Sequence, residues 1–271
     1  MATIVVLTHP YDGFHQAGYL VQGLFPFWIE DGHVVVVHEG VEGAPPADLV
    51  VLHVDRTVVP DDYLELSASY PRSVNGKSAS VAKRSFSQQL LGPDDRYDGP
   101  VIIKTDANFG GLPELRHYHL DRRRGRGPTT PPRFARHYPV LPSLQEVPEE
   151  VRHDSRMVVE RFVPERDAEG NYYLRCWVFF GDRERCTRYR ARVPVIKARD
   201  TLDHAPCEVP NAIRAWRERL DLDYGKLDFV IHEGEPILLD ANRTPTAPAA
   251  VSAVVERGMA QLAPGLDALL G

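Results

Sequence analysis

The strongest constraint on the fold is a segment near the C-terminal end that reads as two β-rich runs around a short connection. Residues 226–242 have the sequence KLDFVIHEGEPILLDAN, in which apolar and β-branched residues flank the letters EGE. Two such runs around a short connection that contains glycine predict a β-hairpin. We expect a three-residue loop, Glu233 to Glu235.

The length of this loop decides whether four polar residues share one face of the hairpin. A three-residue loop places Asp228 opposite Asp240 and Lys226 opposite Asn242, all on the same face. A two- or four-residue loop would shift the pairing by one residue. Because side chains alternate along a strand, Asp228 and Asp240 would then lie on opposite faces.

In the expected register, two carboxylates and one amide oxygen lie close enough to hold a divalent cation. Directly opposed Cβ atoms are about 5 Å apart, and two facing carboxylates repel one another unless a cation lies between them. Since no Cys or cluster of His is near, Asp228, Asp240 and Asn242 favour Mg²⁺ or Mn²⁺ over Zn²⁺. In the alternative interpretation, Asp240 and Asn242 cap a turn before Pro245, and Asp228 lies at a strand edge.

Three runs rich in Val and Leu predict buried parallel strands near the N-terminus, at residues 3–8, 33–38 and 48–54. A helix-length segment, residues 14–30, lies between the first two runs and completes a βαβ pattern. We therefore expect a small Rossmann-like lobe over residues 1–75.

The loop after the first of these strands carries polar side chains. Such lobes bind ligands just beyond the strand ends, which would place His9, Asp12 and His15 beside a crevice. The alternative is that these three are solvated loop residues.

The remaining residues, 76–271, predict a second α/β domain. An amphipathic helix is expected within 78–91 and a strand at 101–104. The segment 121–142 is rich in Arg and Pro, which predicts a long exposed loop. The later elements are expected as strands at 157–163, 173–181 and 188–195 and a helix at 211–220.

Charge and composition narrow the function. The chain has 32 Lys and Arg against 38 Asp and Glu, a formal net charge of −6, which makes nucleic acid an unfavourable partner. Three cysteines without a C-x-x-C pair fit reduced thiols. Neither a signal peptide nor an apolar run long enough to cross a membrane is apparent, so we expect a cytoplasmic protein without membrane contacts.

The order of these motifs resembles the ATP-grasp superfamily, which includes the D-alanine:D-alanine ligases and the ribosomal-protein glutamate ligases. The similarity covers roughly residues 70–247. It implies an α/β (α+β) ATP-grasp fold in which two subdomains, roughly 100–163 and 164–271, grip ATP. The sequence GKLDFVIHEGEPILLDANRTP resembles the family's metal-binding hairpin, which implies Asp228, Asp240 and Asn242 as ligands of ions that bridge the ATP phosphates.

The resemblance also implies residues that contact the nucleotide. VNGKSASVAKRSFSQQL and VIIK are similar to the segments that carry two phosphate-binding lysines, here Lys83 and Lys104, which are among only five lysines in the chain. DANFGGLPE lies where the family has a glycine-rich flap over the phosphates, which implies Gly110 and Gly111.

MVVERFVPE resembles the linker that grips adenine, which implies Glu160, Phe162 and Val163. Glu165 is the nearest acidic residue for the ribose, with Asp167 and Glu169 as rivals.

Three further cations are predicted to act in catalysis. YLRCWVFFGD is similar to the family's strand with an inward arginine, which implies Arg175 near the transferring phosphate or the substrate. In the glutamate ligases an Asp precedes this arginine by two positions, whereas this chain has Tyr173 there. Lys197 and Lys226 complete the set.

By resemblance, we expect a carboxylate-amine ligase that uses ATP and Mg²⁺ (or Mn²⁺). A carboxylate attacks the γ-phosphate to give an acyl phosphate, and an amine then displaces phosphate to form an amide or peptide bond. The substrates would be small-molecule or peptide carboxylates and amines. An ATP-grasp kinase acting on a hydroxyl and a non-catalytic ATP-binding module are the alternatives. Relatives are often dimers, so a homodimer is one expectation, although the sequence itself fixes no oligomeric state.

Overall fold

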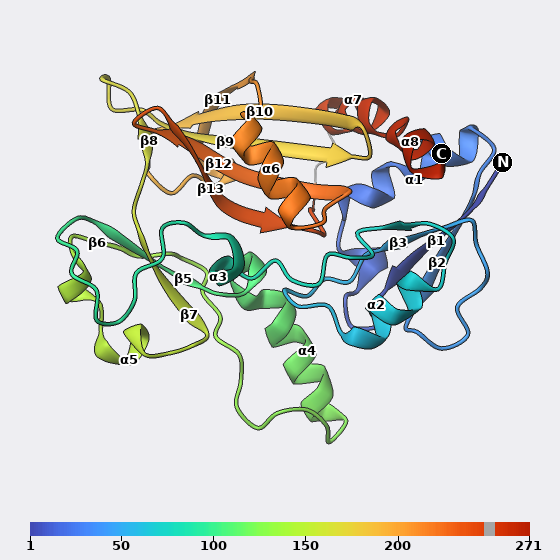
Figure 1. The fold of residues 1–271 in the computed structure, drawn as a ribbon, viewed down its shortest axis with the longest axis horizontal. Coiled ribbons are helices and arrows are strands. Elements are labelled where there is room, and N and C mark those ends of the chain that lie inside the picture. The colour runs from blue at the N-terminus through green and yellow to red at the C-terminus, as the bar shows by residue number, and fades with distance from the viewer. Residues whose placement is uncertain (247–252) are drawn as a thin grey trace.

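The computed structural model of the chain describes residues 1–246 and 253–271, and in this part the strands form three β-sheets (Figure 1). A four-stranded sheet lies at the N-terminal end, followed along the chain by a three-stranded and then a six-stranded sheet. The four-stranded sheet ends at Val74, next to the lobe boundary expected near residue 75.

The N-terminal sheet is parallel, with strand order β2-β1-β3-β4. Its strands are β1 (Thr3–Thr8), β2 (Val34–Glu39), β3 (Leu49–Leu52) and β4 (Ser73–Val74). The central strands β1 and β3 are buried on both faces, which is why their sequences are continuous apolar runs. The three parallel strands expected from these runs are confirmed.

Short helices connect these strands. They are the 3-10 helices η1 (Phe14–Gln16) and η2 (Leu20–Gly23) and the α-helices α1 (Phe25–Glu30) and α2 (Asp61–Ala68). The single helix expected over residues 14–30 is therefore wrong. Gly18 has a positive φ of 56°, which interrupts a right-handed helix, and Pro26 lies in the first turn of α1, where a proline begins a helix.

The three-stranded sheet is antiparallel, with order β6-β5-β7. Its strands are β5 (Val101–Thr105), β6 (Val140–Leu141) and β7 (Met157–Arg161). The accompanying helices are α3 (Lys83–Phe86), η3 (Asn108–Gly111), α4 (Leu112–Arg123), η4 (Leu144–Glu146) and α5 (Glu149–Arg152). The loop expected over residues 121–142 is confirmed only from residue 124 to 139, because α4 continues to Arg123.

The helix expected within residues 78–91 is reduced to the four residues of α3. On one side of α3 the chain is extended, because the Val59 N–H donates to Ala79 O and the Val81 N–H donates to Thr57 O. On the other side, the Leu91 N–H donates to Val159 O of β7. Pairing with distant segments thus replaces the helical hydrogen bonds that the local pattern favoured.

The six-stranded sheet has order β11-β10-β9-β12-β13, and β8 pairs with β9. Its strands are β8 (Glu165–Arg166), β9 (Tyr172–Phe180), β10 (Arg183–Ala191), β11 (Thr201–Pro206), β12 (Tyr224–His232) and β13 (Glu235–Asn242). The remaining helices are η5 (Ala198–Asp200), α6 (Asn211–Arg219), α7 (Ala253–Leu262) and α8 (Gly265–Leu270).

Helices cover the two faces of this sheet differently. Ile213 of α6 belongs to a buried cluster with Trp177 and Phe229 on one face. On the other face, Met259 and Leu262 of α7 belong to a core shared with the N-terminal lobe, and Figure 1 shows α7 and α8 beside α1. This second face is only partly covered and carries the polar residues of the hairpin. None of the helices in the described residues has the length and apolar run needed to cross a bilayer.

Candidate active site

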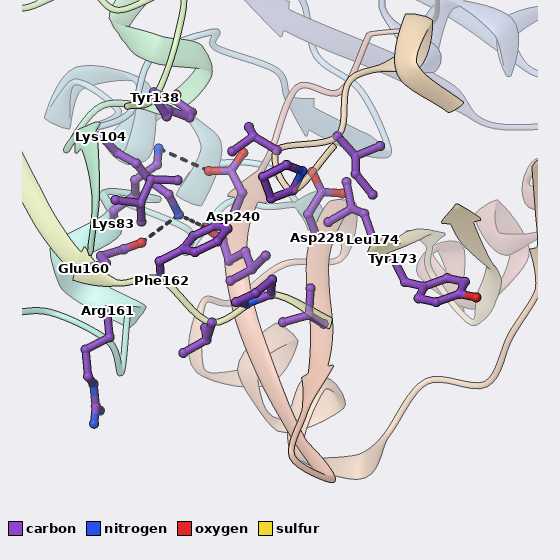
Figure 2. A pocket seen from close by; sticks show the side chains of 18 residues that line it. Lys83, Lys104, Tyr138, Glu160, Arg161, Phe162, Tyr173, Leu174, Asp228 and Asp240 are labelled. Atoms are coloured by element: carbon purple, nitrogen blue, oxygen red, sulfur yellow. Dashed lines mark hydrogen bonds and ion pairs between the residues drawn. The ribbon is translucent and has the colours of Figure 1, made fainter. Parts of the chain in front are cut away.

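The hairpin of β12 and β13 pairs Asp228 with Asp240 and Lys226 with Asn242, as expected from the sequence. Residues two apart on one strand share a face, so all four side chains lie on the same side of the hairpin. Figure 2 shows Asp228 and Asp240 projecting from adjacent strands on that side.

The hairpin reaches this register by a different route from the expected three-residue loop. His232 pairs with Glu235, so the turn has two residues, Glu233 and Gly234, and both have positive φ values of 51° and 87°. Two positive φ values define the type I′ turn that fits the twist of paired strands. The pairing then shifts by one residue, because Phe229 pairs with Leu238 while Asp228 pairs with Asp240.

Leu239 is the extra residue that causes this shift, and it forms a β-bulge. The bulge corrects the register that a two-residue turn would otherwise impose. Its carbonyl oxygen accepts a hydrogen bond from Lys104 Nζ at 3.3 Å. The bulge therefore also connects the hairpin to the three-stranded sheet.

A cavity lies between the three-stranded and six-stranded sheets, and we call it the inter-sheet cavity (Figure 2). The three-stranded sheet contributes Lys104 and Glu160, whereas the hairpin contributes Asp228 and Asp240. The end of β7 and the linker that follows it line the cavity with residues 161–164. Two distant parts of the chain thus supply the polar groups of one site.

Each lysine of this region faces a carboxylate. Lys83 Nζ lies 3.2 Å from Asp240 Oδ1, and Lys104 Nζ lies 2.7 Å from Glu160 Oε2. On the hairpin itself, Lys226 Nζ lies 2.8 Å from Asp228 Oδ2. The three cations therefore balance the three anions.

Because these charged side chains are buried, the charged forms of Lys83 and Lys226 depend on their carboxylate partners. The Lys83 side chain is 2% exposed and the Glu160 side chain 3% exposed. Burial alone would lower the pKa of Lys83, but the Asp240 carboxylate outweighs it and holds this pKa above its usual value. In the same way, burial opposes and Asp228 favours the charged form of Lys226, whose pKa is raised. Both lysines are ammonium ions at neutral pH.

Three carboxylate oxygens of the site lack a hydrogen bond from the described residues: Glu160 Oε1, Asp228 Oδ1 and Asp240 Oδ1. A buried acceptor without a donor costs free energy, so such atoms call for a partner. Asp240 Oδ1 has only its ion pair with Lys83. Oxygen atoms of Asp228 and Asp240 on adjacent strands match the ligand chemistry of Mg²⁺.

Asn242 is less available as a ligand than its position predicts. Its Oδ1 already accepts hydrogen bonds from Asn108 Nδ2 at 3.2 Å and from the Thr244 N–H at 2.8 Å. An amide oxygen has two lone pairs, and both are used in this arrangement. The residues present therefore fit a cation held by Asp228 and Asp240, whereas Asn242 would have to exchange one of its partners to join them.

The linker residues expected at the adenine lie on the cavity. Glu160, Phe162 and Val163 all line it. The Phe162 N–H donates to Pro100 O at 2.8 Å, which fixes the start of the linker against the three-stranded sheet. Figure 2 shows Arg161 pointing away from the carboxylates.

Arg175 and Glu165 are not brought to the inter-sheet cavity, in contrast to the roles expected for them. In the register of β9 and β12, Cys176 pairs with Asp228 and Arg175 pairs with Phe229. Because neighbouring residues of a strand point to opposite faces, Arg175 lies on the face opposite Asp228. There it forms two hydrogen bonds with Glu165, at 3.0 and 2.7 Å. We therefore leave both residues out of the site.

Gly110 and Gly111 also lie outside the cavity lining, in η3. Their φ values are 66° and 81°, and a Cβ atom on them would lie 2.3 Å from Ala135 O and 2.2 Å from Arg133 O. Glycine is thus required here by positive φ and by close approach of the Arg- and Pro-rich loop. The role of these glycines as a flap stays a prediction.

Lys197 lines a second cavity that adjoins the first, and its Nζ donates to Arg136 O at 2.8 Å. Tyr138, from the same loop as Arg136, lines the inter-sheet cavity and was missed by the sequence analysis. The local sequence does not predict this position for Tyr138, because the residue reaches the site only through the path of the loop in the folded chain.

The loop after β1 does not form the open crevice that the sequence suggested. Asp12 Oδ1 lies 2.9 Å from His117 Nε2, and Asp12 Oδ2 accepts from the N–H groups of His9 and Asp55. His9, Asp12 and His117 are close enough to share a metal ion. Both Asp12 oxygens are nevertheless used in bonds that brace the lobe, and His15 is exposed.

Comparison with known proteins supports the fold. No protein-family model matches the sequence, and no curated protein matches it. D-alanine–D-alanine ligase from Bacillus anthracis is similar in structure, with a TM-score of 0.53 and 12% identity over 100% of this chain and 96% of that chain. A RimK-domain ATP-grasp protein from Sphaerobacter thermophilus has a TM-score of 0.54 and 13% identity over 99% and 100%.

A RiPP-associated ATP-grasp ligase from Chryseobacterium gregarium, in complex with ADP and a leader and core peptide, is also similar. Its TM-score is 0.52 at 11% identity, over 97% of this chain and 96% of that chain. These matches span nearly the whole length of both partners. The chain has the ATP-grasp fold, as the resemblance in the sequence implied.

Proposed function

We propose that the chain is an ATP-dependent ligase that joins a carboxylate to an amine through an acyl phosphate and releases ADP and phosphate. The observation that carries this proposal is that two carboxylates on adjacent strands, Asp228 and Asp240, line one cavity together with two buried lysines, Lys83 and Lys104. The substrates we propose are small-molecule or peptide carboxylates and amines.

The charges of the cavity support binding of ATP together with divalent cations. Among the side chains that line the inter-sheet cavity, three cations (Lys83, Lys104 and Arg161) balance three anions (Glu160, Asp228 and Asp240), so the lining offers no net attraction to the four negative charges of free ATP. Magnesium held by Asp228 and Asp240 would supply the missing positive charge and draw off electron density from the phosphate oxygens. Asp228 and Asp240 would act as its ligands. Asn242, through its hydrogen bonds with Asn108 and Thr244, would fix the strand that carries Asp240.

Lys83 and Lys104 are proposed to follow the transferring phosphoryl group. An ammonium ion on a long side chain can keep contact with phosphate oxygens as charge moves among them. Asp240 and Glu160 hold these two lysines in place through ion pairs. Catalysis in this scheme is positioning and charge stabilisation, and the protein itself forms no covalent bond.

Lys226 is proposed to orient the carboxylate substrate. Its ammonium group lies beside Asp228, the proposed metal ligand, and Lys226 also lines the adjoining second cavity. Lys226 therefore lies between the proposed position of the ATP phosphates and a cavity through which a substrate can enter. The carboxylate oxygen attacks the γ-phosphorus as the bond to ADP breaks. The amine nitrogen then attacks the acyl carbon, loses a proton, and inorganic phosphate leaves.

Adenine is proposed to lie against the linker from Glu160 to Pro164. Backbone groups at the end of a strand can pair with the edge of a purine. Phe162 and Val163 supply an apolar surface beside them.

The test supplies ATP, Mg²⁺, hydroxylamine and a panel of carboxylates, and measures ADP and hydroxamate together. We expect both products in equal amounts, because hydroxylamine intercepts an acyl phosphate. A stable phosphorylated product without hydroxamate would indicate a kinase instead. Binding of ATP without ADP release for any carboxylate would contradict the ligase proposal.

A further inference from the structure

Two of the three cysteines lie side by side on the face of the six-stranded sheet opposite the hairpin aspartates. Cys186 Sγ of β10 and Cys207 Sγ, just after β11, are 3.1 Å apart, and both thiols are free. Thr187 and Asp228 both pair with Cys176, so these three residues share one face. Because neighbouring residues of a strand alternate, Cys186 lies on the other face.

The backbone holds the two cysteines in an arrangement that suits a disulfide. Thr187 pairs with Pro206 in the antiparallel register of β10 and β11, so Cys186 and Cys207 come next and lie opposite each other. The Cys207 N–H donates to Cys186 O at 3.2 Å, which extends this pairing by one residue beyond β11. Opposed residues of an antiparallel pair have Cα atoms about 4.5 to 5.5 Å apart, within the range that disulfides span. A bond between the two sulfurs therefore requires little movement of the backbone.

The surroundings of the two thiols differ. Cys186 is 8% exposed and belongs to the buried cluster that contains Trp177, and burial, followed by the neighbouring Cys207, raises the pKa of the Cys186 thiol. Cys207 is half-buried. It lies beside the guanidinium of Arg175, whose pKa is raised chiefly by Glu165 and to a smaller extent by Cys207. Reactive cysteines are typically partly exposed and close to a cation, so Cys207 is the thiol that reacts first.

A reagent can reach both thiols from the surface. Cys186 and Cys207 line an open groove of about 960 Å³, together with residues of α6 and α7. A volume of several hundred cubic ångströms, roughly 300–1,000 Å³, is typical of sites that admit a small organic molecule. The groove lies on the face of the sheet away from Asp228 and has its own opening to solvent.

The chain between the two cysteines borders the proposed active site. Residues 187–206 comprise the end of β10, η5 and β11, and residues 194–196 within them line the inter-sheet cavity. Residues 196–198 line the second cavity. A disulfide at the base of this segment would close a loop that contains part of the wall of both cavities. Such a link opposes local opening, because it limits the separation of the two ends.

We propose that Cys186 and Cys207 are a redox-sensitive pair that a low-molecular-weight disulfide, such as oxidised glutathione, converts into an internal disulfide that restrains the segment between them. The Cys207 thiolate attacks one sulfur of the glutathione disulfide, and one glutathione leaves as its thiolate. Cys186 Sγ then loses its proton and attacks Cys207 Sγ, and the second glutathione leaves. The protein gives up two electrons and two protons, which the two released glutathione molecules carry.

The first experiment treats the folded protein with oxidised glutathione, quenches the reaction with acid, alkylates the remaining thiols in denaturant and maps them by mass spectrometry. We expect a disulfide between Cys186 and Cys207 that dithiothreitol reverses. Cys176 should be alkylated, because it lies on the other face of the sheet. Three alkylated cysteines, or a disulfide that contains Cys176, would overturn the proposal.

Single variants test which thiol reacts first. Cys186→Ala should stop at one glutathione bound to Cys207, whereas Cys207→Ser should leave Cys186 unmodified. Cys176→Ser is the matched control and should form the same disulfide as the unchanged protein. Thermal unfolding shows whether each variant folds, and Cys186→Ser replaces Cys186→Ala if the alanine variant does not. Glutathione on Cys186 in Cys207→Ser, or none on Cys207 in the Cys186 variant, would contradict the assignment.

Hydrogen exchange of the reduced and oxidised forms tests the restraint. We expect the backbone amides of residues 192–206 to exchange at least about fivefold more slowly in the oxidised form, because the disulfide opposes local opening. Dithiothreitol should restore the faster exchange, and Cys207→Ser should exchange at the same rate with and without oxidised glutathione. Equal rates in the reduced and oxidised forms of the unchanged protein would overturn the proposed restraint.

Discussion

Lys226 and Arg175 show how the face of a strand decides the role of a cation. Lys226 lies on the face of the sheet that carries both aspartates, whereas Arg175 lies on the opposite face and is held by Glu165. The two side chains carry the same charge and lie on adjacent strands. Of these two residues, Lys226 can reach a ligand in the cavities and Arg175 cannot.

Lys226→Met is therefore expected to lower the rate of ADP formation by about a hundredfold or more, because it removes a charge that acts on the reacting carboxylate. Arg175→Met is the matched control, and its rate should stay within a few-fold of the unchanged protein. Thermal unfolding of both variants shows whether the fold persists. A larger loss for Arg175→Met than for Lys226→Met would contradict the assignment of faces.

His53 is a buried residue whose environment disfavours its charged form. It is 0% exposed and is enclosed by the rings of Phe14, Tyr19 and Tyr224, and neither ring nitrogen has a hydrogen-bond partner in the described residues. Burial lowers the pKa of His53 from 6.5 to about 4. The unfolded chain thus takes up a proton near pH 6.5, whereas the folded chain does so only near pH 4.

Because the unfolded state binds this proton first, stability falls as the pH drops from about 6.5 to about 4. The shift corresponds to roughly 3 kcal/mol at most from His53. We expect His53→Phe to lose correspondingly less free energy of unfolding over this range, measured by urea titration at pH 7 and pH 4.5. His9 titrates over the same interval in both proteins, so the difference isolates His53. Identical pH profiles would mean that the pKa of His53 is the same in the folded and the unfolded chain.

Among the elements, the hairpin shows how far sequence reasoning can reach. The pairing of Asp228 with Asp240 was predicted from an expected three-residue loop, and the pairing is confirmed. The loop length was wrong, because local sequence did not reveal that Leu239 forms a bulge. Likewise, the N-terminal strands were evident from their apolar runs. The helix expected within residues 78–91, in contrast, is reduced to the four residues of α3, because its flanks pair with residues 57–59 and with β7.

Deletion of Leu239 tests the bulge directly. Without the extra residue, the register of the two-residue turn continues unbroken and pairs Asp240 with Asp228, so both side chains keep the same face. We expect this deletion to preserve most of the Mg²⁺-dependent ATP binding, because it removes the bulge and leaves the pairing of the two aspartates unchanged.

Deletion of both Leu238 and Leu239 instead places Asp240 opposite Phe229, on the other face of the hairpin. This double deletion should abolish the binding, measured by calorimetry. Equal binding by the single and the double deletion would argue against a role for the register.

At the scale of the whole molecule, the site depends on contacts that no local pattern reveals. Lys104 meets Glu160 because β5 and β7 pair, and Lys83 meets Asp240 across more than half of the chain. Tyr138 enters from a loop without regular structure. The sequence could predict which residues carry charge and in what order, but not which cation faces which anion, since this requires the packing of two sheets.

This assembly from two sheets predicts that the nucleotide stabilises the entire fold. At a concentration of MgATP about 100 times its dissociation constant, linkage adds about 2.7 kcal/mol, which corresponds to a rise in Tm of about 5 to 10 °C. ATP with EDTA should give a much smaller rise, because the cavity charges sum to zero. Asp203→Asn, in an exposed ion pair on β11, is a suitable control and should respond like the unchanged protein. An equal rise with and without Mg²⁺ would contradict the charge argument.

The most direct measurement is anomalous diffraction from crystals grown with Mn²⁺ and a non-hydrolysable ATP analogue. The account predicts a manganese peak about 2 Å from carboxylate oxygens of both Asp228 and Asp240, with the triphosphate beside Lys83 and Lys104. A nucleotide bound without metal at these aspartates, or a manganese peak away from the hairpin, would contradict it.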